Sequence, residues 1–305
     1  MNTFKHFLIS ILLVVLPIAL WAQVFTQMNE IAAPISATGS SNLANIGSAW
    51  AQLNNPAGLC RLTALELVGG LYRPYGLSYY NSAVAIIAMP IGKVGTMAIG
   101  YQGSSTSYSG NSLTSETAFS LSHGFYLQKD LFSTLSLGYT LNLYQLDYGH
   151  SAGVSGDGSD GMDLGSGFGF GLDLGLQGSL HERSWIGLFV KNINSPEMGS
   201  ALSAQRLPRS VAIGLGYEPY YGLTTNFVIY QKIGTDKTQY RAGLEYRIVP
   251  WLVLRTGVNT EPNRIGFGFG IEKWGILADY AYISHPLLPE THQFSLGYSF
   301  RKNEK

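Results

Sequence analysis

LGSGFGFGLDLGLQGSL, residues 164–180, decides the fold because its side chains alternate in character along the whole stretch. One series of positions is mostly apolar: Leu164, Ser166, Phe168, Phe170, Leu172, Leu174 and Leu176. The positions between them are small or polar: Gly165, Gly167, Gly169, Gly171, Asp173, Gly175 and Gln177. A period of two is that of a β-strand, and at roughly 3.3 Å per residue this strand would be about 50 Å long. That length far exceeds soluble strands, and an apolar face opposite a glycine-rich face is typical of a transmembrane barrel wall.

The N-terminus predicts export from the cytoplasm. Lys5 and His6 form a short basic region, residues 7–20 are apolar, and Ala22 ends a cleavage site before Gln23. Residues 1–22 therefore have the pattern of a secretory signal peptide. The apolar run is too short to span a membrane comfortably, and an uncleaved anchor is the alternative. We expect the exported chain in the cell outer membrane of a Gram-negative bacterium.

Composition narrows the class of protein. Charged residues make up 12% of the chain and the formal net charge is zero, so there is no electrostatic case for a nucleic-acid partner. The single cysteine, Cys60, excludes an internal disulfide. No later segment has about 18 consecutive apolar residues, so we expect no membrane-spanning helix. An outer-membrane barrel and a soluble secreted β-protein remain, and the second should carry alternating charged positions that this chain lacks.

Strand-like stretches follow an N-terminal segment, residues 23–63, that has no clear strand period. There are fourteen of them, with approximate spans 64–72, 78–89, 94–103, 114–127, 133–148, 164–180, 184–193, 207–218, 222–233, 237–249, 251–260, 264–272, 275–285 and 291–300. An even count fits a bacterial barrel whose two ends both lie in the periplasm. We predict an all-β fold, a 14-stranded antiparallel transmembrane outer-membrane β-barrel over 64–300, with an N-terminal plug segment and a polar tail, 301–305.

The lengths of the connections predict the orientation of the barrel. The even-numbered connections are all short: 90–93, 128–132, 181–183, 219–221, 250 and 273–274. The long connections are all odd-numbered: 104–113, 149–163, 194–206 and 285–290. Barrels of this class have short periplasmic turns and longer extracellular loops.

Aromatic residues gather at the predicted periplasmic edge. They are Trp185, Trp251, Trp274, Tyr217, Tyr220, Tyr221 and Tyr246. Girdles of such rings mark the lipid–water boundary of barrels, so we expect these residues to form one at this edge.

The last predicted strand carries a candidate barrel-assembly signal. Its apolar face contains Phe294, Leu296, Tyr298 and Phe300. A closing strand that ends in an aromatic residue resembles the signal read by the outer-membrane barrel assembly machinery. The polar tail departs from the commonest form, in which the aromatic residue comes last.

Strand parity assigns the charged residues to the lumen. The predicted lumen-facing charges are Glu66, Glu116, Asp173, Arg241, Glu245, Arg247, Arg255 and Asp279. Charge inside a membrane span is costly unless it is paired or in water. We therefore expect these groups to pair with each other or with the plug, with substrate binding as the alternative.

The segment before the first strand carries a motif, Asn55-Pro56-Ala57-Gly58-Leu59. With the small residues before it and the strands after it, this motif resembles the FadL-type outer-membrane proteins, and more closely the PorV/PorQ branch found in Bacteroidota. Stretches such as Arg241-Ala242-Gly243-Leu244-Glu245-Tyr246 extend the resemblance along the chain. The resemblance implies an N-terminal hatch held inside the barrel; a periplasmic tail is the alternative.

Metal and catalytic sites are weakly indicated. The loop 149–163 contains Asp157, Asp160 and Asp163 among glycines; carboxylates could ligate calcium, but their spacing does not match the EF-hand loop, and an ordinary acidic surface loop is the alternative. No Ser-His-acid order and no metal-ligand cluster stand out, so we expect no enzyme activity, no cofactor and no metal.

Three functions remain open from the sequence. The first is a PorV/PorQ-like component of type IX secretion, which by resemblance receives or shuttles secreted cargo proteins on loops 104–113, 149–163 and 194–206. The second is a FadL-type uptake channel for hydrophobic small molecules such as long-chain fatty acids, with an apolar pocket and an opening in the barrel wall. The third is a barrel without transport. Expected partners are outer-membrane lipid and, by function, secretion components or a hydrophobic ligand.

Overall fold

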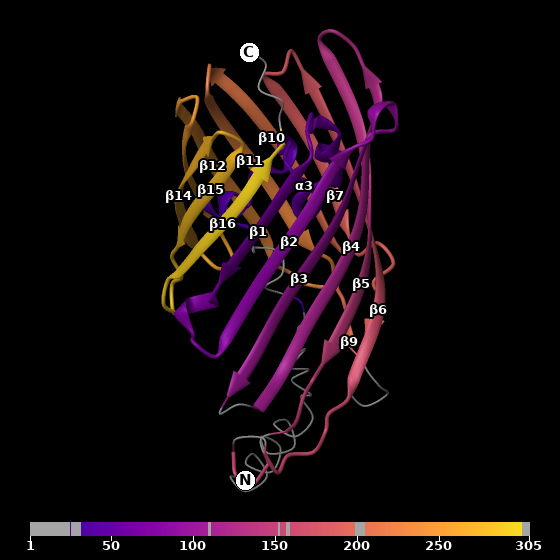
Figure 1. Ribbon diagram of the computed structural model, residues 1–305, viewed down its shortest axis with the longest axis vertical. Helices are drawn as coiled ribbons and strands as arrows, with labels where there is room; N and C mark the ends of the chain where they lie inside the picture. The colour runs from indigo at the N-terminus through magenta and orange to yellow at the C-terminus, as the bar shows by residue number, and fades with distance from the viewer. Residues whose placement is uncertain are drawn as a thin grey trace, which may run out of the picture.

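The chain folds into a closed antiparallel barrel of fourteen strands (Figure 1). The computed structural model describes Phe25 and residues 32–108, 111–151, 153–156, 159–198 and 205–300. The predicted signal peptide, 1–22, and polar tail, 301–305, lie outside these residues. Consecutive strands of the barrel are hydrogen-bonded, β7 pairs with β10, and β16 closes the barrel on β1.

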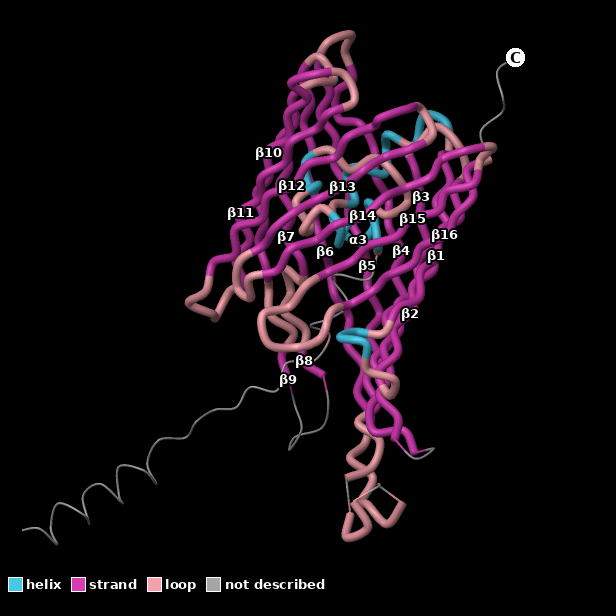
Figure 2. Tube along the Cα trace, turned by 90° about the vertical axis from the view of Figure 1, so that its left-hand side faces the viewer, coloured by secondary structure: helices cyan, strands magenta, loops and turns pink. Residues whose placement is uncertain are grey.

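The barrel strands follow the predicted spans closely, so the predicted fold is confirmed. They are β1 (Glu66–Tyr72), β2 (Tyr80–Pro90), β3 (Thr96–Tyr108), β4 (Asn111–Lys129), β5 (Ser133–Asp147), β6 (Ser166–Leu180), β7 (Ser184–Lys191), β10 (Ser210–Tyr220), β11 (Leu223–Lys232), β12 (Thr238–Val249), β13 (Leu252–Asn259), β14 (Arg264–Lys273), β15 (Ile276–Ile283) and β16 (Thr291–Ser299). Short turns lie at one end, called periplasmic below, and long loops at the outer end, which is lowermost in Figures 1 and 2.

Two of the predicted long loops are wrong in detail. Most of 104–113 is strand, because β3 and β4 continue to a hairpin in which Tyr108 pairs with Asn111. Its serines and threonines show no apolar period, yet antiparallel pairing needs only the backbone and threonine favours strands. The loop 194–206 contains a separate two-stranded sheet, β8 (Glu197–Met198) with β9 (Gln205–Arg206).

The two faces of β6 separate as predicted. Phe168 and Phe170 are 63% and 53% exposed on the outer face, whereas Asp173 and Gln177 are 3% exposed on the inner face. The exposed apolar side chains continue around the other strands and form the surface that faces lipid.

One member of the predicted aromatic girdle is misplaced. Trp251, Trp274 and the predicted tyrosines are exposed at the periplasmic edge, but Trp185 is buried inside the barrel. On β7 it shares the inner face with Gly187 and Phe189, and the guanidinium of Arg61 lies 5.7 Å from its ring centroid. A position near a turn sets the depth of a side chain, but strand parity sets its face.

The N-terminal segment fills the barrel with four short helices. These are α2 (Ala33–Ala37), η2 (Asn42–Ala44), α3 (Ala51–Asn54) and η3 (Pro56–Arg61), drawn in cyan within the strands of Figure 2. Helix α2 contacts β13 to β16, η2 contacts β7, β10 and β11, and η3 contacts β3 to β6. The segment therefore reaches opposite sides of the lumen, and we call residues 32–62 the plug. None of the described helices is long and apolar enough to cross a membrane.

Glycines on the inner faces let the plug approach the wall. A Cβ atom at Gly138 of β5 would lie 2.2 Å from the carbonyl carbon of Pro56, and one at Gly175 of β6 would lie 2.1 Å from Oδ1 of Asn55. Farther out along β6, Gly169 packs against Met198 in the same way. The glycine face that first indicated a strand is thus closely packed, mainly by the plug at its periplasmic half.

Substituting Gly138→Ala should destabilise the folded barrel by about 1–3 kcal/mol, because the added methyl group meets plug backbone that has no space to move. The matched control is Gly69→Ala, whose Cβ points to the lipid side and meets one carbonyl oxygen at 3.2 Å. The measurement is the temperature at which the compact band is lost in a heat-modifiability gel. Equal temperatures for both variants would show that the plug does not fix the wall at this point.

Candidate functional site

The plug is fixed to the wall by two buried amide side chains. Gln52 Nε2 donates to the carbonyl oxygens of Ala98 and Ser120, at 3.2 and 3.3 Å, and to Ser122 Oγ at 3.0 Å. Asn55 Nδ2 donates to the Leu176 carbonyl oxygen of β6 at 3.1 Å. Together they connect the plug to β3, β4 and β6.

The predicted plug motif, residues 55–59, forms the start of helix η3. Asn55 caps η3, since its Oδ1 accepts a hydrogen bond from the Ala57 amide at 3.2 Å. Pro56 opens the helix, and a Cβ atom at Gly58 would lie 2.2 Å from the Ile46 carbonyl oxygen. Gln52, which sequence reasoning missed, lies three residues before Asn55 in the adjoining helix α3.

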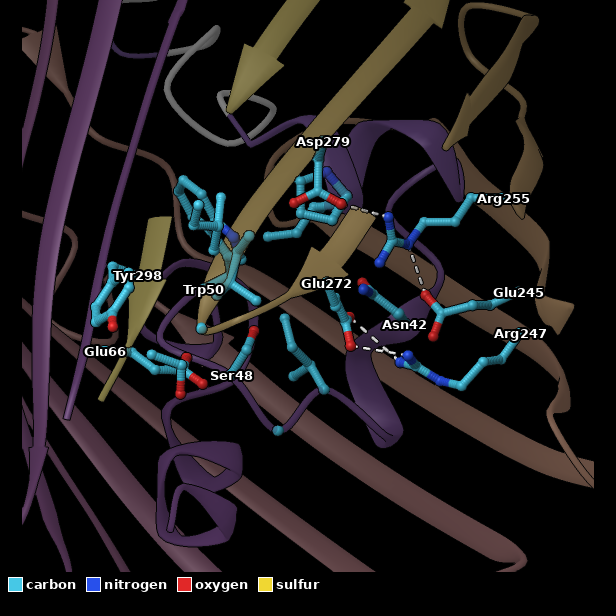
Figure 3. A pocket seen from close by; sticks show the side chains of 18 of the residues that line it. Asn42, Ser48, Trp50, Glu66, Glu245, Arg247, Arg255, Glu272, Asp279 and Tyr298 are labelled. Carbon is cyan, nitrogen blue, oxygen red and sulfur yellow. Dashed lines mark hydrogen bonds and ion pairs between the residues drawn. The ribbon is translucent and has the colours of Figure 1, made fainter. Parts of the chain in front are cut away.

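A cavity of about 540 Å³ lies between the plug and β12 to β15, and we call it the vestibule (Figure 3). Its lining reaches the periplasmic turns at Pro250 and Trp274 and extends to Trp50 of the plug. Charged side chains of the wall point into it, and Arg61 of the plug is also part of its lining, so the periplasmic half of the lumen is polar.

Ion pairs cross the wall of the vestibule (Figure 3). Arg255 Nε lies 2.7 Å from Glu245 Oε2, and Arg255 Nη1 lies 2.6 Å from Asp279 Oδ1. Arg247 Nη1 lies 2.8 Å from Glu272 Oε2. The structure thus brings together four of the predicted charges and adds Glu272. This residue shares the inner face of β14 with the glycines, so strand parity could also have predicted that it faces the lumen. Pairing satisfies these groups in a region where unpaired charge is costly.

The remaining predicted charges lie apart from these ion pairs. Glu66 Oε2 lines the vestibule and accepts the Ala49 amide at 2.9 Å, which holds the plug. Asp173 accepts hydrogen bonds from Asn142 Nδ2 at 2.8 Å and from the Asn192 amide at 2.7 Å. The last two predicted lumen-facing charges are Glu116 and Arg241. Glu116 accepts a hydrogen bond from the Phe25 backbone, and the guanidinium carbon of Arg241 lies 4.2 Å from the centroid of the Tyr230 ring.

The acidic loop is folded by its own carboxylates. Asp160 accepts hydrogen bonds from the Ser155 hydroxyl and amide, which holds the pKa of this exposed carboxyl below its usual value. Asp163 accepts the Gly165 amide at 2.8 Å, and Asp157 lies outside the described residues. Across the described ranges, no group of three or more His, Cys, Asp or Glu residues is placed to hold a metal.

Toward its outer end the lumen holds an apolar cluster, next to buried polar side chains such as Asn142 and Asp173. The described side chains that form this outer apolar cluster are Phe25, Tyr72, Val84, Tyr144, Leu146, Met198 and Leu207. Met198 and Leu207 are each 1% exposed and come from the long loop between β7 and β10, which therefore folds into the lumen. The rings of Phe25 and Tyr144 lie 5.0 Å apart between centroids.

Beside this cluster the wall has a seam between β6 and β7. Their pairing ends at Leu174 opposite Val190, so residues 166–173 of β6 have no strand partner on that side in the described part of the chain. Residues 193 and 194 bind β6 there instead. The Ile193 amide donates to the Leu172 carbonyl at 2.8 Å, Asn194 Oδ1 accepts from the Leu172 amide at 3.0 Å, and Asn194 Nδ2 donates to the Phe170 carbonyl at 2.5 Å. Residues 192–198, which we call the cover, thus close the seam with few contacts.

The predicted assembly-signal residues lie on the outer surface of β16 and just beyond it. Phe294, Leu296, Tyr298 and Phe300 are 60%, 67%, 40% and 50% exposed. They are thus accessible from the lipid side, and their role in assembly stays a prediction.

Comparisons with known proteins identify the fold. No protein-family model and no curated protein matches the chain. A solved structure of TodX, described as a monoaromatic hydrocarbon channel and carrying a deletion, is 13% identical, with a TM-score of 0.63 over 90% of this chain and 99% of that one.

Two further solved structures agree. The toluene transporter TodX of Pseudomonas putida is 13% identical, with a TM-score of 0.54 over 85% of this chain and 96% of that one. A Pseudomonas aeruginosa FadL homologue is 10% identical, with a TM-score of 0.54 over 89% of this chain and 98% of that one. At these identities the likeness shows the fold alone, which is that of FadL-type outer-membrane barrels.

Replacing Arg255→Met should destabilise the barrel by about 1–3 kcal/mol, because the partly buried carboxylates of Glu245 and Asp279 lose their shared cation. Adding Glu245→Gln and Asp279→Asn to the same chain should restore much of the loss. The matched control, Lys237→Met, breaks an exposed ion pair with Glu261 and should change little. Thermal unfolding in detergent, followed by gel mobility, measures all three; equal effects of the two single changes would contradict the pairing.

Proposed function

We propose that this barrel is an uptake channel for hydrophobic small molecules. The observation that carries the proposal is the outer apolar cluster, which lies beside the seam and at the opposite end of the lumen from the polar vestibule. Water-soluble solutes gain nothing from an apolar lining, whereas a hydrophobic solute gains about 25 cal/mol for each Å² removed from water. The shared fold with channels for hydrophobic molecules supports the same function.

The seam supplies an entry route from the membrane. Phe170 and Leu172 face lipid on the outer side of β6, while Met198 packs on the inner side of the same strand at Gly169. A displacement of the cover would therefore join the lipid phase to the outer apolar cluster. We assign the described conformation to the closed state, because Met198 and Leu207 occupy that space.

The structure of the wall and of the long loops bears on the choice between hydrophobic uptake and cargo shuttling. An uptake channel is expected to have an opening in the barrel wall, and in the described wall the strand pairing is interrupted where β7 ends. Cargo shuttling, ranked first from the sequence, has weaker support, because loop 104–113 is mostly strand and Met198, within 194–206, packs into the lumen. We therefore rank uptake above secretion.

Expression of the full-length chain in a Gram-negative host tests the proposal. The initial uptake rates of radiolabelled toluene and of oleate are compared with those of the same host carrying an empty vector. We expect saturable, faster uptake of at least one of the two. Rates equal to the vector control for both probes, with the barrel folded in a heat-modifiability gel, would contradict the function.

Substituting Asn194→Ala should raise the uptake rate up to about tenfold, because two hydrogen bonds that hold the cover to β6 are lost. The control is Asn263→Ala, an exposed turn asparagine at the same end of the barrel. A rate unchanged by Asn194→Ala, or raised equally by the control, would remove the seam from the transport route without excluding transport itself.

A further inference from the structure

A hollow of about 710 Å³ lies on the lipid-facing surface of β1 to β4 and β16. These strands lie side by side on the front of the barrel in Figure 1. Its floor has small side chains, among them Ala83, Gly103 and Ser105, while Leu71, Tyr101 and Phe294 form its apolar sides. Its volume falls within the range of about 300–1,000 Å³ that is usual for sites that hold small molecules.

The hollow is amphipathic along the membrane normal. Leu71 pairs with Phe294 across the β1–β16 contact, and both side chains are at least 60% exposed. One step farther toward the outer end, Arg73 and His292 line the hollow. Arg73 and His292 thus lie next to Leu71 and Phe294 on the side toward the outer end of the barrel, which carries the long loops.

Hydrogen bonds orient the two basic side chains of the hollow, and no carboxylate of its lining neutralises their charge. Arg73 Nε donates to Asn81 Oδ1 at 3.2 Å, which directs the side chain along the hollow. His292 Nδ1 is hydrogen-bonded to the Tyr280 hydroxyl at 2.7 Å, so Nε2 is the ring nitrogen that faces a ligand. None of the ion pairs in the described part of the chain involves Arg73, and no carboxylate lines the hollow.

We propose that this hollow is a binding site for a phosphorylated lipid of the outer leaflet. Its acyl chain lies against Leu71, Tyr101 and Phe294, and its phosphate is held by Arg73 with His292. Arginine matches phosphate geometry through paired N–H donors, and basic side chains at a membrane surface select anionic headgroups. An isolated interfacial arginine would merely extend into water, whereas here an apolar hollow lies directly beneath it.

Lipid retention by the purified full-length barrel tests the proposal. The protein is reconstituted in phosphatidylcholine bilayers that contain a minor fraction of diphosphorylated lipid A, then transferred to detergent and analysed by native mass spectrometry. We expect lipid A to be retained in preference to phosphatidylcholine. Arg73→Ala should weaken retention about tenfold, and Arg73→Ala with His292→Ala should weaken it further.

Two matched variants separate the headgroup from the hollow. Ala83→Phe keeps both basic groups but fills the floor, so it should also lose lipid A. Lys237→Ala removes a different cation at the outer end and should retain it. Each variant is first shown to be folded by a heat-modifiability gel, and Arg73 is exposed outside the strands, so its variant tests the site even if Ala83→Phe does not fold.

The following results would overturn the proposal. They are retention of lipid A unchanged by loss of Arg73 and His292, equal retention of phosphatidylcholine, and a dimer in which a second copy covers the hollow. Retention of added laurate without lipid A would likewise assign the site to free anionic amphiphiles instead. The site is independent of transport, so the uptake rates of these variants should match the unsubstituted protein.

Discussion

Backbone hydrogen bonding inside a bilayer is the constraint on which this structure depends. Each unpaired N–H or C=O group in the apolar layer costs several kcal/mol, so a membrane-spanning sheet has to close on itself. Here β16 pairs with β1 along the whole length of β1, and the closure is complete on that side. The seam between β6 and β7 is the exception in the described wall, and there the Ile193 amide and the Asn194 side chain substitute for a strand. A few hydrogen bonds from one short segment hold the wall more weakly than a paired strand does, which makes the seam the natural place for movement.

Closure also determines what lies inside. Fourteen strands enclose more space than their own side chains fill, so the plug occupies the lumen and inner-face glycines give it room. Charges on the inner faces are paired across neighbouring strands around Arg255, and this divides the lumen into a polar vestibule and an outer apolar cluster. The transport proposal rests on that division.

Alternation of side chains made the strands and their inner and outer faces predictable, because membrane lipid imposes a strict period of two. It also predicted that Glu245, Arg247, Arg255 and Asp279 point inward. Trp185 was assigned to the girdle because its position near a turn, which sets depth, was used in place of strand parity, which sets the face. The cover and the β8–β9 sheet were unpredictable for another reason: their contacts, such as Asn194 with Leu172 and Met198 with Gly169, are set by three-dimensional proximity and leave no periodic pattern.

Hydrogen–deuterium exchange of the full-length barrel in lipid bilayers tests the central claim, that the seam is the movable part of the wall. Peptides that cover 166–174 and 191–198 are compared with those that cover 66–72 and 291–299, with and without added toluene. The account predicts faster exchange on both sides of the seam than at the β1–β16 contact, and a further increase there when toluene is present. Equal protection at both places, or an increase confined to the β1–β16 contact, would contradict it.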